Sequence, residues 1–237
     1  MTSHADPSAK AIKTLDKDLN RIGLLEHATM FTARPLVGPG IALVFIVLAG
    51  LGAATIMGAG AGTWVVVMAA AIGAYMALNI GANDVANNMG PAVGAKAVTL
   101  GGALLIAAIC ETAGALLAGG DVVSTVSRGI VAPESVAEPA IFVWAMMAAL
   151  LAGALWIHLA TAMGAPVSTT HSIVGGVMGS GIAAAGLSAV NWSVMGKIAA
   201  SWVISPVLGG VIAAGFLAIL NNRILYREDK LAAARTW

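Results

Sequence analysis

The apolar run "WVVVMAAAIGAYMALNI" (Trp64–Ile80) passes directly into the polar stretch "GANDVANN" (Gly81–Asn88). The first stretch has roughly the length and the character of a helix that spans a bilayer, which needs about 20 predominantly apolar residues. The second stretch contains an aspartate and three asparagines, and a fourth asparagine, Asn79, stands just before it. Polar and ionisable residues attached to a membrane segment in this way predict a polar site inside a helical membrane protein.

The composition of the whole chain favours the same class. Of its 237 residues, 59% are hydrophobic and 10% are charged, and the mean hydropathy is +0.92. Soluble domains carry roughly 25% charged residues, so the chain lacks the polar surface that a water-soluble globule needs. We therefore expect an all-α polytopic protein of the cell membrane, in contact with the lipid bilayer. A net charge of +1 without a basic cluster gives no sign of nucleic-acid binding, and the single Cys110 excludes an internal disulfide.

Six apolar stretches lie near the length that spans a bilayer, and they predict about six transmembrane or re-entrant helical segments. The fifth is short and rich in glycine, so it either crosses the membrane or dips in and returns. We expect six crossings. The stretches are Gly40–Met57, Trp64–Ile80, Thr99–Leu117, Ala140–Met163, Ile173–Leu187 and Ile198–Leu220.

The polar ends of the chain set the expected domains and orientation. Residues 1–35 form an N-terminal tail, residues 36–220 the membrane part, and residues 221–237 a C-terminal tail. Apolar residues recur at helical spacing from Ile12 to Ile22, which predicts an amphipathic helix at the membrane surface. Nine of the 12 Lys and Arg residues lie in the two tails, which places both tails in the cytoplasm and requires an even number of crossings.

Asn79, Asn83 and Asn87 are spaced so that a continuous helix stacks them on one face. Gly81 and a proline at position 91 weaken helices, so the sequence predicts a broken or kinked helix here. Asparagines can simply join helices through amide hydrogen bonds that contribute about 0.6–2 kcal/mol each. An ionised carboxylate at midplane is costlier, at about 2.5 kcal/mol or more, so Asp84 indicates an ion or substrate path.

A second polar stretch, "APVSTTHS" (Ala165–Ser172), separates the fourth and fifth apolar runs. Pro166 is suited to the first position of a helix, because its missing N–H would be unpaired there anyway. Free N–H groups at a helix start, joined by hydroxyl groups, predict a site for a tetrahedral oxyanion. An ordinary helix cap, which needs only one hydroxyl, is the alternative. The hydroxyls belong to Ser168, Thr169, Thr170 and Ser172. The glycines of "GGVMGSG" (Gly175–Gly181), which follow, predict close helix packing.

Three further ionisable residues lie in or beside the spans. His171 is either a proton carrier or anion donor, or a core histidine, whereas His158 is expected to serve in packing or hydrogen bonding. Glu111 is either a neutral, hydrogen-bonded acid or a site for a coupling cation. The spans lack a fixed Lys or Arg, so an anion beside Asp84 is repelled unless sodium or a proton binds first. This order of binding is typical of cation-coupled anion transport.

The chain resembles the PiT family of inorganic phosphate transporters. The resemblance rests on "GANDVANNMGPAVGAKAVTL" from Gly81, on "GAPVSTTHSIVGGVMGSGIA" from Gly164 and on "SWVISP" from Ser201, and it extends over about Tyr75 to Leu220. It implies a secondary transporter, not an enzyme, that moves inorganic phosphate with sodium or protons as the coupling ion and uses no cofactor.

The resemblance also assigns site residues. Asn83 and Asp84 would lie at both the phosphate and the cation site, and phosphate oxygens would be bound by Ser168, Thr169 and Thr170, with Asn87 as a neighbour. We add Asn79 and Glu111 as further candidates for the cation site, because both are polar residues within apolar spans.

Members of the PiT family contain two inverted repeats, and each repeat carries one copy of both motifs. Only one copy of each is present here, so the chain resembles the N-terminal half. We therefore expect either a fragment or split-gene product of a longer transporter, or a half-transporter that works as a homo-oligomer or with a complementary second half. A sulfate permease of the same fold and a non-transporting membrane scaffold or regulatory subunit are the alternatives.

Overall fold

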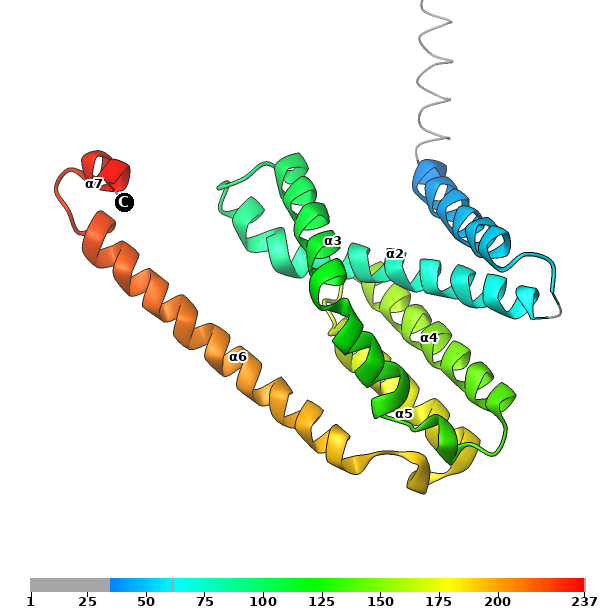
Figure 1. Cartoon of the computed structure of the whole chain (residues 1–237). Coiled ribbons are helices and arrows are strands. Elements are labelled where there is room, and N and C mark those ends of the chain that lie inside the picture. The colour runs from blue at the N-terminus through cyan, green and yellow to red at the C-terminus, as the bar shows by residue number, and fades with distance from the viewer. Residues whose placement is uncertain (1–34, 61, 237) are drawn as a thin grey trace, which may run out of the picture. The chain divides into compact units, whose positions relative to one another are not determined.

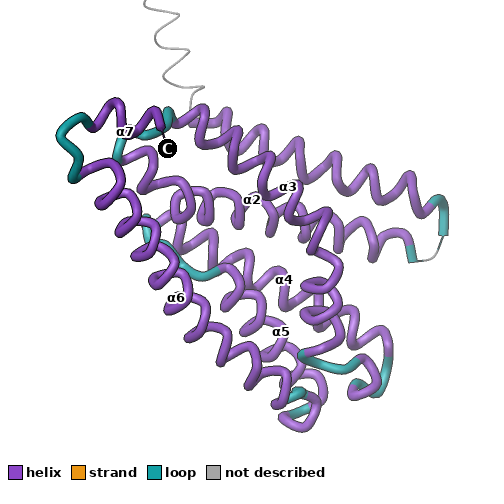
Figure 2. Tube along the Cα trace, turned by 60° about the vertical axis from the view of Figure 1, so that its left-hand side comes forward, coloured by secondary structure: helices purple, strands orange, loops and turns teal. Residues whose placement is uncertain are grey.

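The computed structural model describes residues 35–60 and 62–236. Over these residues the backbone consists of helices joined by short loops (Figures 1 and 2), and the single β feature among them is an isolated bridge between Val131 and Val190. The predicted all-α fold class is therefore confirmed. The amphipathic helix predicted between Ile12 and Ile22 lies outside the described residues.

The helices follow the apolar stretches of the sequence. A first helix covers Pro35–Met57. The others are α2 (Thr63–Gly94), α3 (Leu100–Ser124), α4 (Pro139–Ala162), α5 (Thr169–Ala185), α6 (Trp192–Leu220) and α7 (Lys230–Thr236). Wider π-helical turns extend α3 over Thr125–Gly129 and α6 over Asn221–Leu225, and two short 3₁₀ turns lie in loops at Pro133–Ser135 and Leu187–Ala189.

Each of the six predicted stretches lies mostly or wholly within a helix. Among the described residues, five helices are long and apolar enough to cross a bilayer: Pro35–Met57, α2, α3 with its π turn, α4, and α6 with its π turn. The sixth, α5, has 17 residues and so measures about 25 Å, slightly less than the roughly 30 Å hydrocarbon layer. That α5 crosses the membrane stays a prediction.

The helix α2 continues without a break through the polar stretch, so the predicted break is wrong, whereas the alternative of a kink stays a prediction. Helical structure runs from Thr63 to Gly94 and includes Gly81 and Pro91. A glycine inside a helix costs only about 1 kcal/mol relative to alanine. Pro91 lies in the last turn of α2. The two buried asparagines, Asn79 and Asn83, also satisfy their amides with partners on the same or a neighbouring helix, so α2 needs no unwinding to accommodate them.

The chain divides into two compact units, which we describe separately. The first comprises Met1–Pro91 with Gly153–Thr169, and the second comprises Ala92–Ala152 with Thr170–Trp237. In the first unit the end of α4 packs against α2, and the buried residues of α2 are Ala74, Met76, Asn79 and Asn83. The first unit therefore holds most of the polar candidates.

The core of the second unit lies where its loops meet α4 and α5. The buried cluster joins residues of the α3–α4 loop and the α5–α6 loop to residues of α4 and α5: Ile130, Val131, Val136, Ala149, Val174, Val177, Ala189 and Val190. The two loops are fastened by the Val131–Val190 bridge and by a 2.8 Å hydrogen bond from the Asn191 N–H to the Ile130 carbonyl. The contact between the two loops thus holds together the ends of the helices that they connect, α3 with α4 and α5 with α6.

Close packing of α5 depends on one face of its glycine-rich run. A Cβ added at Gly176 would lie 2.7 Å from the carbonyl oxygen of Ala149 on α4. At Gly175 and Gly179, by contrast, an added Cβ would meet no atom within 4 Å. The predicted close approach therefore applies to Gly176, while the Gly175 and Gly179 face is open. Outside these contacts the helices expose large apolar side chains, and none of the residues of α6 is buried, as suits a surface in lipid.

Candidate functional site

The amide of Asn83 joins α2 to the end of α4 and to the segment after it. Its Nδ2 donates to the hydroxyl oxygen of Thr161 at 2.9 Å and to the carbonyl of Ala165 at 3.4 Å. Its Oδ1 accepts from the N–H of Val167 at 3.2 Å. Because the Val167 N–H can only donate, the atom of the Asn83 amide that faces it must be the oxygen, which fixes the orientation of the amide. We call Asn83, Thr161, Ala165 and Val167 the Asn83 cluster.

The carboxylate of Asp84 binds the first residue of α5. The hydroxyl of Thr169 donates to Asp84 Oδ2 at 2.9 Å, and Thr169 is buried, with 8% of its surface exposed. Hydrogen bonds to an ionised group contribute more than neutral ones, about 1.5–3 kcal/mol. The one hydroxyl proton of Thr169 is used in this bond, so its oxygen presents lone pairs, which suit a cation better than an anion.

Asn79 and His158 form a second link between α2 and α4, one turn from Asn83. Asn79 Nδ2 donates to the carbonyl of Tyr75 at 2.8 Å, so Oδ1 is the atom that faces His158 Nδ1, at 3.1 Å. His158 Nδ1 therefore carries the proton in this pair. The Tyr75 ring lies against the imidazole, with centroids 5.9 Å apart. The prediction that His158 serves in hydrogen bonding and packing is confirmed.

A cavity of about 330 Å³ opens beside the Asn83 cluster. Its lining comes from α2 and from the end of α4 with the following turn, and all its members are uncharged: Ala82, Asn83, Ala86, Asn87, Thr161, Gly164, Ala165 and Pro166. Gly164 has a φ of +68°, a left-handed conformation that glycine adopts without strain. It turns the chain after α4 and so shapes the cavity wall.

The structure brings some predicted site residues together and leaves others apart. Asp84 and Thr169 share a hydrogen bond, and Asn83, next to Asp84 in the chain, binds the segment that leads to Thr169. Asn79 lies one turn away with its amide bound to His158 and Tyr75. The remaining candidates are exposed in the single chain: Asn87, Ser168, Thr170 and Glu111. Of these, Glu111 on α3 and Thr170 both belong to the second compact unit.

Pro166 does not open the helix that follows it, so that prediction is wrong by three residues. The helix α5 begins at Thr169, and residues 165–168 have no regular structure. The physical reason is the Asn83 cluster, since Asn83 binds the Ala165 carbonyl and the Val167 N–H from the side. These contacts hold residues 165–167 in the loop.

Thr161 is the member of the site that sequence reasoning missed. It accepts from Asn83 and lines the cavity. A signal for it exists, because His158 and Thr161 are spaced i, i+3 on an otherwise apolar helix. That spacing places two polar groups on the face of α4 that meets the asparagines of α2.

In the second unit, His171 on α5 stacks on Trp202 of α6. The ring centroids are 3.7 Å apart and the planes are inclined by 27°. The imidazole thus has a packing partner.

Comparison with known proteins gives the context for this arrangement. A profile described as the phosphate transporter family matches residues 80–237. The chain belongs to the phosphate transporter family. The resemblance predicted from the motifs is confirmed, and membership together with the five long apolar helices makes the chain a multi-pass membrane protein.

Individual relatives extend the comparison of this family member beyond the profile. A protein of Helicobacter pylori (strain J99) named "Putative phosphate permease" is 51% identical over 217 residues, which cover 92% of this chain and 41% of that protein. A Thermococcus kodakarensis relative with the same kind of name is 43% identical over 70% of this chain and 41% of its own length.

A solved structure is also similar to this member of the family. It is described as the sodium-dependent phosphate transporter and has a TM-score of 0.67 and 43% identity, over 72% of this chain and 42% of its own. The chain thus spans about two fifths of the length of the relatives it matches.

Proposed function

We propose that this chain takes part in secondary active transport of inorganic phosphate across the cell membrane, coupled to sodium or protons. The observation that carries the proposal is the hydrogen bond between Asp84 and the buried Thr169 in a membrane helix. An ionisable group within a membrane-spanning helix is costly, and transporters use such groups in ion and substrate paths. The names of the relatives, phosphate permease and sodium-dependent phosphate transporter, support phosphate as the substrate.

The charges beside Asp84 suggest the order of binding. The residues that line the neighbouring cavity are uncharged, so they cannot offset repulsion between a phosphate and the aspartate. A cation that binds first at Asp84, with the lone pairs of the Thr169 oxygen as a second ligand, removes that repulsion. Binding of the cation then raises the affinity for phosphate, which is the coupling that a symporter needs.

The remaining candidate residues keep the roles expected from the sequence. In this proposal phosphate contacts Asn83, Asp84, Asn87 and the hydroxyls of Ser168, Thr169 and Thr170, whereas Asn79 and Glu111 belong with Asn83 and Asp84 to the cation path. Asn83 and Asn79 have their amides engaged in the single chain. They would contact a ligand only by exchanging those hydrogen bonds, and Thr169 would donate to phosphate only by releasing Asp84. We therefore place most weight on Asp84 and Thr169 as ligands of the cation.

We further propose that the transporting unit is an assembly, either of two copies of this chain or of this chain with a complementary half. Asn87, Ser168 and Thr170 are exposed in the single chain. A phosphate held only by groups that face hydrocarbon would be unstable, since every polar group there needs a partner. A second polypeptide surface over these residues would enclose the substrate.

Uptake by proteoliposomes tests the proposal. The purified chain is reconstituted, and uptake of labelled phosphate is measured with a sodium gradient, with a proton gradient, and with neither. Excess sulfate is the competitor in a parallel series. We expect uptake that one of the two gradients accelerates and that sulfate leaves largely unchanged, because phosphate can donate a hydrogen bond to an acceptor such as Asp84 and sulfate cannot.

The other outcomes separate the alternatives. Uptake abolished by sulfate would favour a sulfate permease. Complete absence of uptake would rule out transport by this chain alone and favour a scaffold or a half that needs its complement. Co-reconstitution with the part of a relative that this chain does not match then distinguishes a scaffold from a half-transporter, because only a half-transporter would gain phosphate uptake.

A further inference from the structure

The stretch "SWVISP" (Ser201–Pro206) on α6 has no part in the proposed transport site, although its tryptophan makes a specific contact. The indole of Trp202 stacks on the imidazole of His171 in the first turn of α5, with ring centroids 3.7 Å apart and planes inclined by 27°. Trp202 and the α5 residue Ile173 also pack against the buried cluster of the second unit. The contact therefore joins α6 to the beginning of α5.

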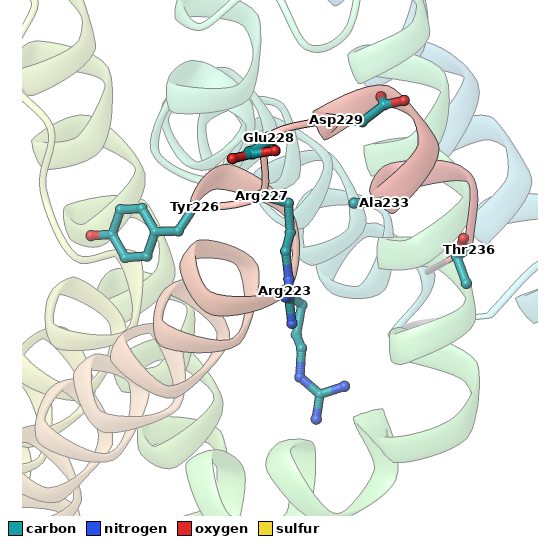
Figure 3. Close-up of a pocket in the computed structure, with 7 residues that line it drawn as sticks. All are labelled: Arg223, Tyr226, Arg227, Glu228, Asp229, Ala233 and Thr236. Carbon is teal, nitrogen blue, oxygen red and sulfur yellow. The ribbon is translucent and has the colours of Figure 1, made fainter.

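Trp202 is the last residue of α6 that is not exposed. Before it, Met195 and Ile198 pack against the same buried cluster, whereas every residue from Val203 to Leu220 is exposed. Beyond α6 the chain lines a separate cavity of about 670 Å³, and Figure 3 shows that its lining consists of residues between Arg223 and Thr236, none of which belongs to α5. The attachment of α6 to the start of α5 thus depends on the side chain of Trp202.

The first turn of α5 is held from two opposite sides. Thr169 and His171 are two positions apart, so their side chains leave the helix axis in directions about 200° apart. Thr169 donates to Asp84 on α2, and His171 stacks on Trp202. The boundary between the two compact units falls between Thr169 and Thr170. The orientation of this turn is therefore set by one contact in each unit.

The orientation of this turn matters for the cation that we place at Asp84 and Thr169. Two oxygens bind one ion well only if their separation is fixed before the ion arrives. If the first turn of α5 were free to rotate, the binding free energy would have to supply the cost of ordering it. A contact that fixes the turn in advance therefore raises the affinity for the cation.

We propose that Trp202 is a positioning residue for the cation site: its stack with His171 fixes the first turn of α5 so that Thr169 faces Asp84. This inference rests on the proposed role of Asp84 and Thr169 as cation ligands. Trp202 contacts neither the cation nor phosphate, and it acts through His171.

Three variants test the proposal in the assembly that transports phosphate. Trp202→Leu removes the ring, Trp202→Phe keeps an aromatic ring for the stack, and Trp156→Leu makes the same truncation at a tryptophan on α4 that is 55% exposed. Phosphate uptake is measured against the concentration of the coupling cation at saturating phosphate. An aromatic pair contributes about 2- to 10-fold to an equilibrium constant. Trp202→Leu should raise the half-saturating cation concentration by this factor and leave the maximal rate largely unchanged.

The two other variants should stay close to the unmodified protein. A fall in the maximal rate with an unchanged half-saturating concentration in Trp202→Leu would overturn the proposal, because it would show a structural role alone. The same shift in Trp156→Leu, or the same values for leucine and phenylalanine at position 202, would also overturn it.

A double-mutant cycle tests the positioning without any need for transport. Trp202→Leu and Thr169→Val are combined in the full chain in detergent, and the free energies of unfolding are compared with a cycle of Trp156→Leu and Thr169→Val. Residues that act on each other give non-additive losses, whereas independent residues add. Non-additivity in the first cycle alone supports the positioning role, and if the unmodified protein then shows no uptake, only the transport proposal fails. Additivity in both cycles would overturn the positioning role.

Discussion

The hydroxyl of Thr169 donates a 2.9 Å hydrogen bond to Oδ2 of Asp84 and so ties the first residue of α5 to the middle of the "GANDVANN" stretch on α2. The two residues lie far apart in sequence, and their contact joins the two polar motifs. Whatever changes the charge of Asp84 therefore acts directly on the start of α5.

The first prediction concerns that charge. Asp84→Asn keeps the size of the side chain and an oxygen that accepts from Thr169, but it removes the negative charge that a cation needs. We expect the fold to be retained and cation-coupled phosphate uptake to fall more than about tenfold, the factor for a loss of about 1.4 kcal/mol. Proteoliposome uptake measures this, and Glu134→Gln in the α3–α4 loop is the control. Unchanged coupled uptake would remove Asp84 from the mechanism.

The second prediction tests whether Asn83 stabilises the fold while Asn87 does not. Asn83→Leu leaves the N–H of Val167 and the hydroxyl of Thr161 without their partner. We expect a loss of about 1–3 kcal/mol in the free energy of unfolding, the penalty for a buried unsatisfied group. The exposed Asn87 is the matched control, and Asn87→Leu should leave thermal stability in detergent almost unchanged. Equal stability of the two variants would contradict the role of the Asn83 cluster.

The third prediction concerns the pair of Asn79 and His158. A double-mutant cycle with Asn79→Leu and His158→Leu measures their coupling free energy. Interhelical hydrogen bonds in membranes contribute about 0.6 kcal/mol on average and up to about 1.7 kcal/mol. We expect a coupling in this range in a steric-trap or denaturant unfolding experiment. Strict additivity of the two single variants would show that the 3.1 Å contact adds no stability.

The fourth prediction concerns the packing of α5 on α4. In Gly176→Ala the new Cβ would lie 2.7 Å from the Ala149 carbonyl oxygen. Because backbone must shift to relieve this contact, we expect destabilisation of about 1–3 kcal/mol. Gly179→Ala has open space around its Cβ and should be neutral or slightly stabilising, since alanine favours helices. The midpoints of thermal unfolding of the two variants make the comparison.

The fifth prediction decides whether α5 crosses the membrane. With Cys110 replaced by alanine, single cysteines are placed at Glu134, between α3 and α4, and at Arg235 on α7. Three crossings by α4, α5 and α6 put these positions on opposite sides. An impermeant thiol reagent added to intact cells should then label the cysteine at position 134 and leave the one at position 235 unlabelled. Labelling of both or of neither would mean that α5 re-enters.

The helices were predictable because the apolar runs that define them are local. The run Ala140–Met163 became α4 at Pro139–Ala162 with a shift of a single residue at each end. The bilayer requires such runs whatever the tertiary structure, so their length and hydropathy were sufficient. The face that Asn79 and Asn83 share was also predictable, since helical periodicity alone sets it.

The partners of the polar groups were not predictable in the same way. That Asn83 binds Thr161 and Val167 depends on α2 meeting the end of α4, and the sequence does not state which helices meet. The errors at Pro166 and in the continuity of α2 have the same origin. At Pro166 local propensity favoured a helix start, whereas tertiary hydrogen bonds hold a loop before α5. In α2 local propensity favoured a break, whereas hydrogen bonds support an unbroken helix.

The fastening of the two loops in the second unit has a consequence for how the protein is made. Ile130 and Val131 are almost completely buried, and their partners Val190 and Asn191 are synthesised only after α4 and α5. Until the ribosome has delivered those later residues, α3 and α4 enter the bilayer without the contact that fixes their ends. The pair of loops therefore closes only after α5 has been made, and a chain released before Asn191 would leave its valines open to the quality-control machinery of the membrane.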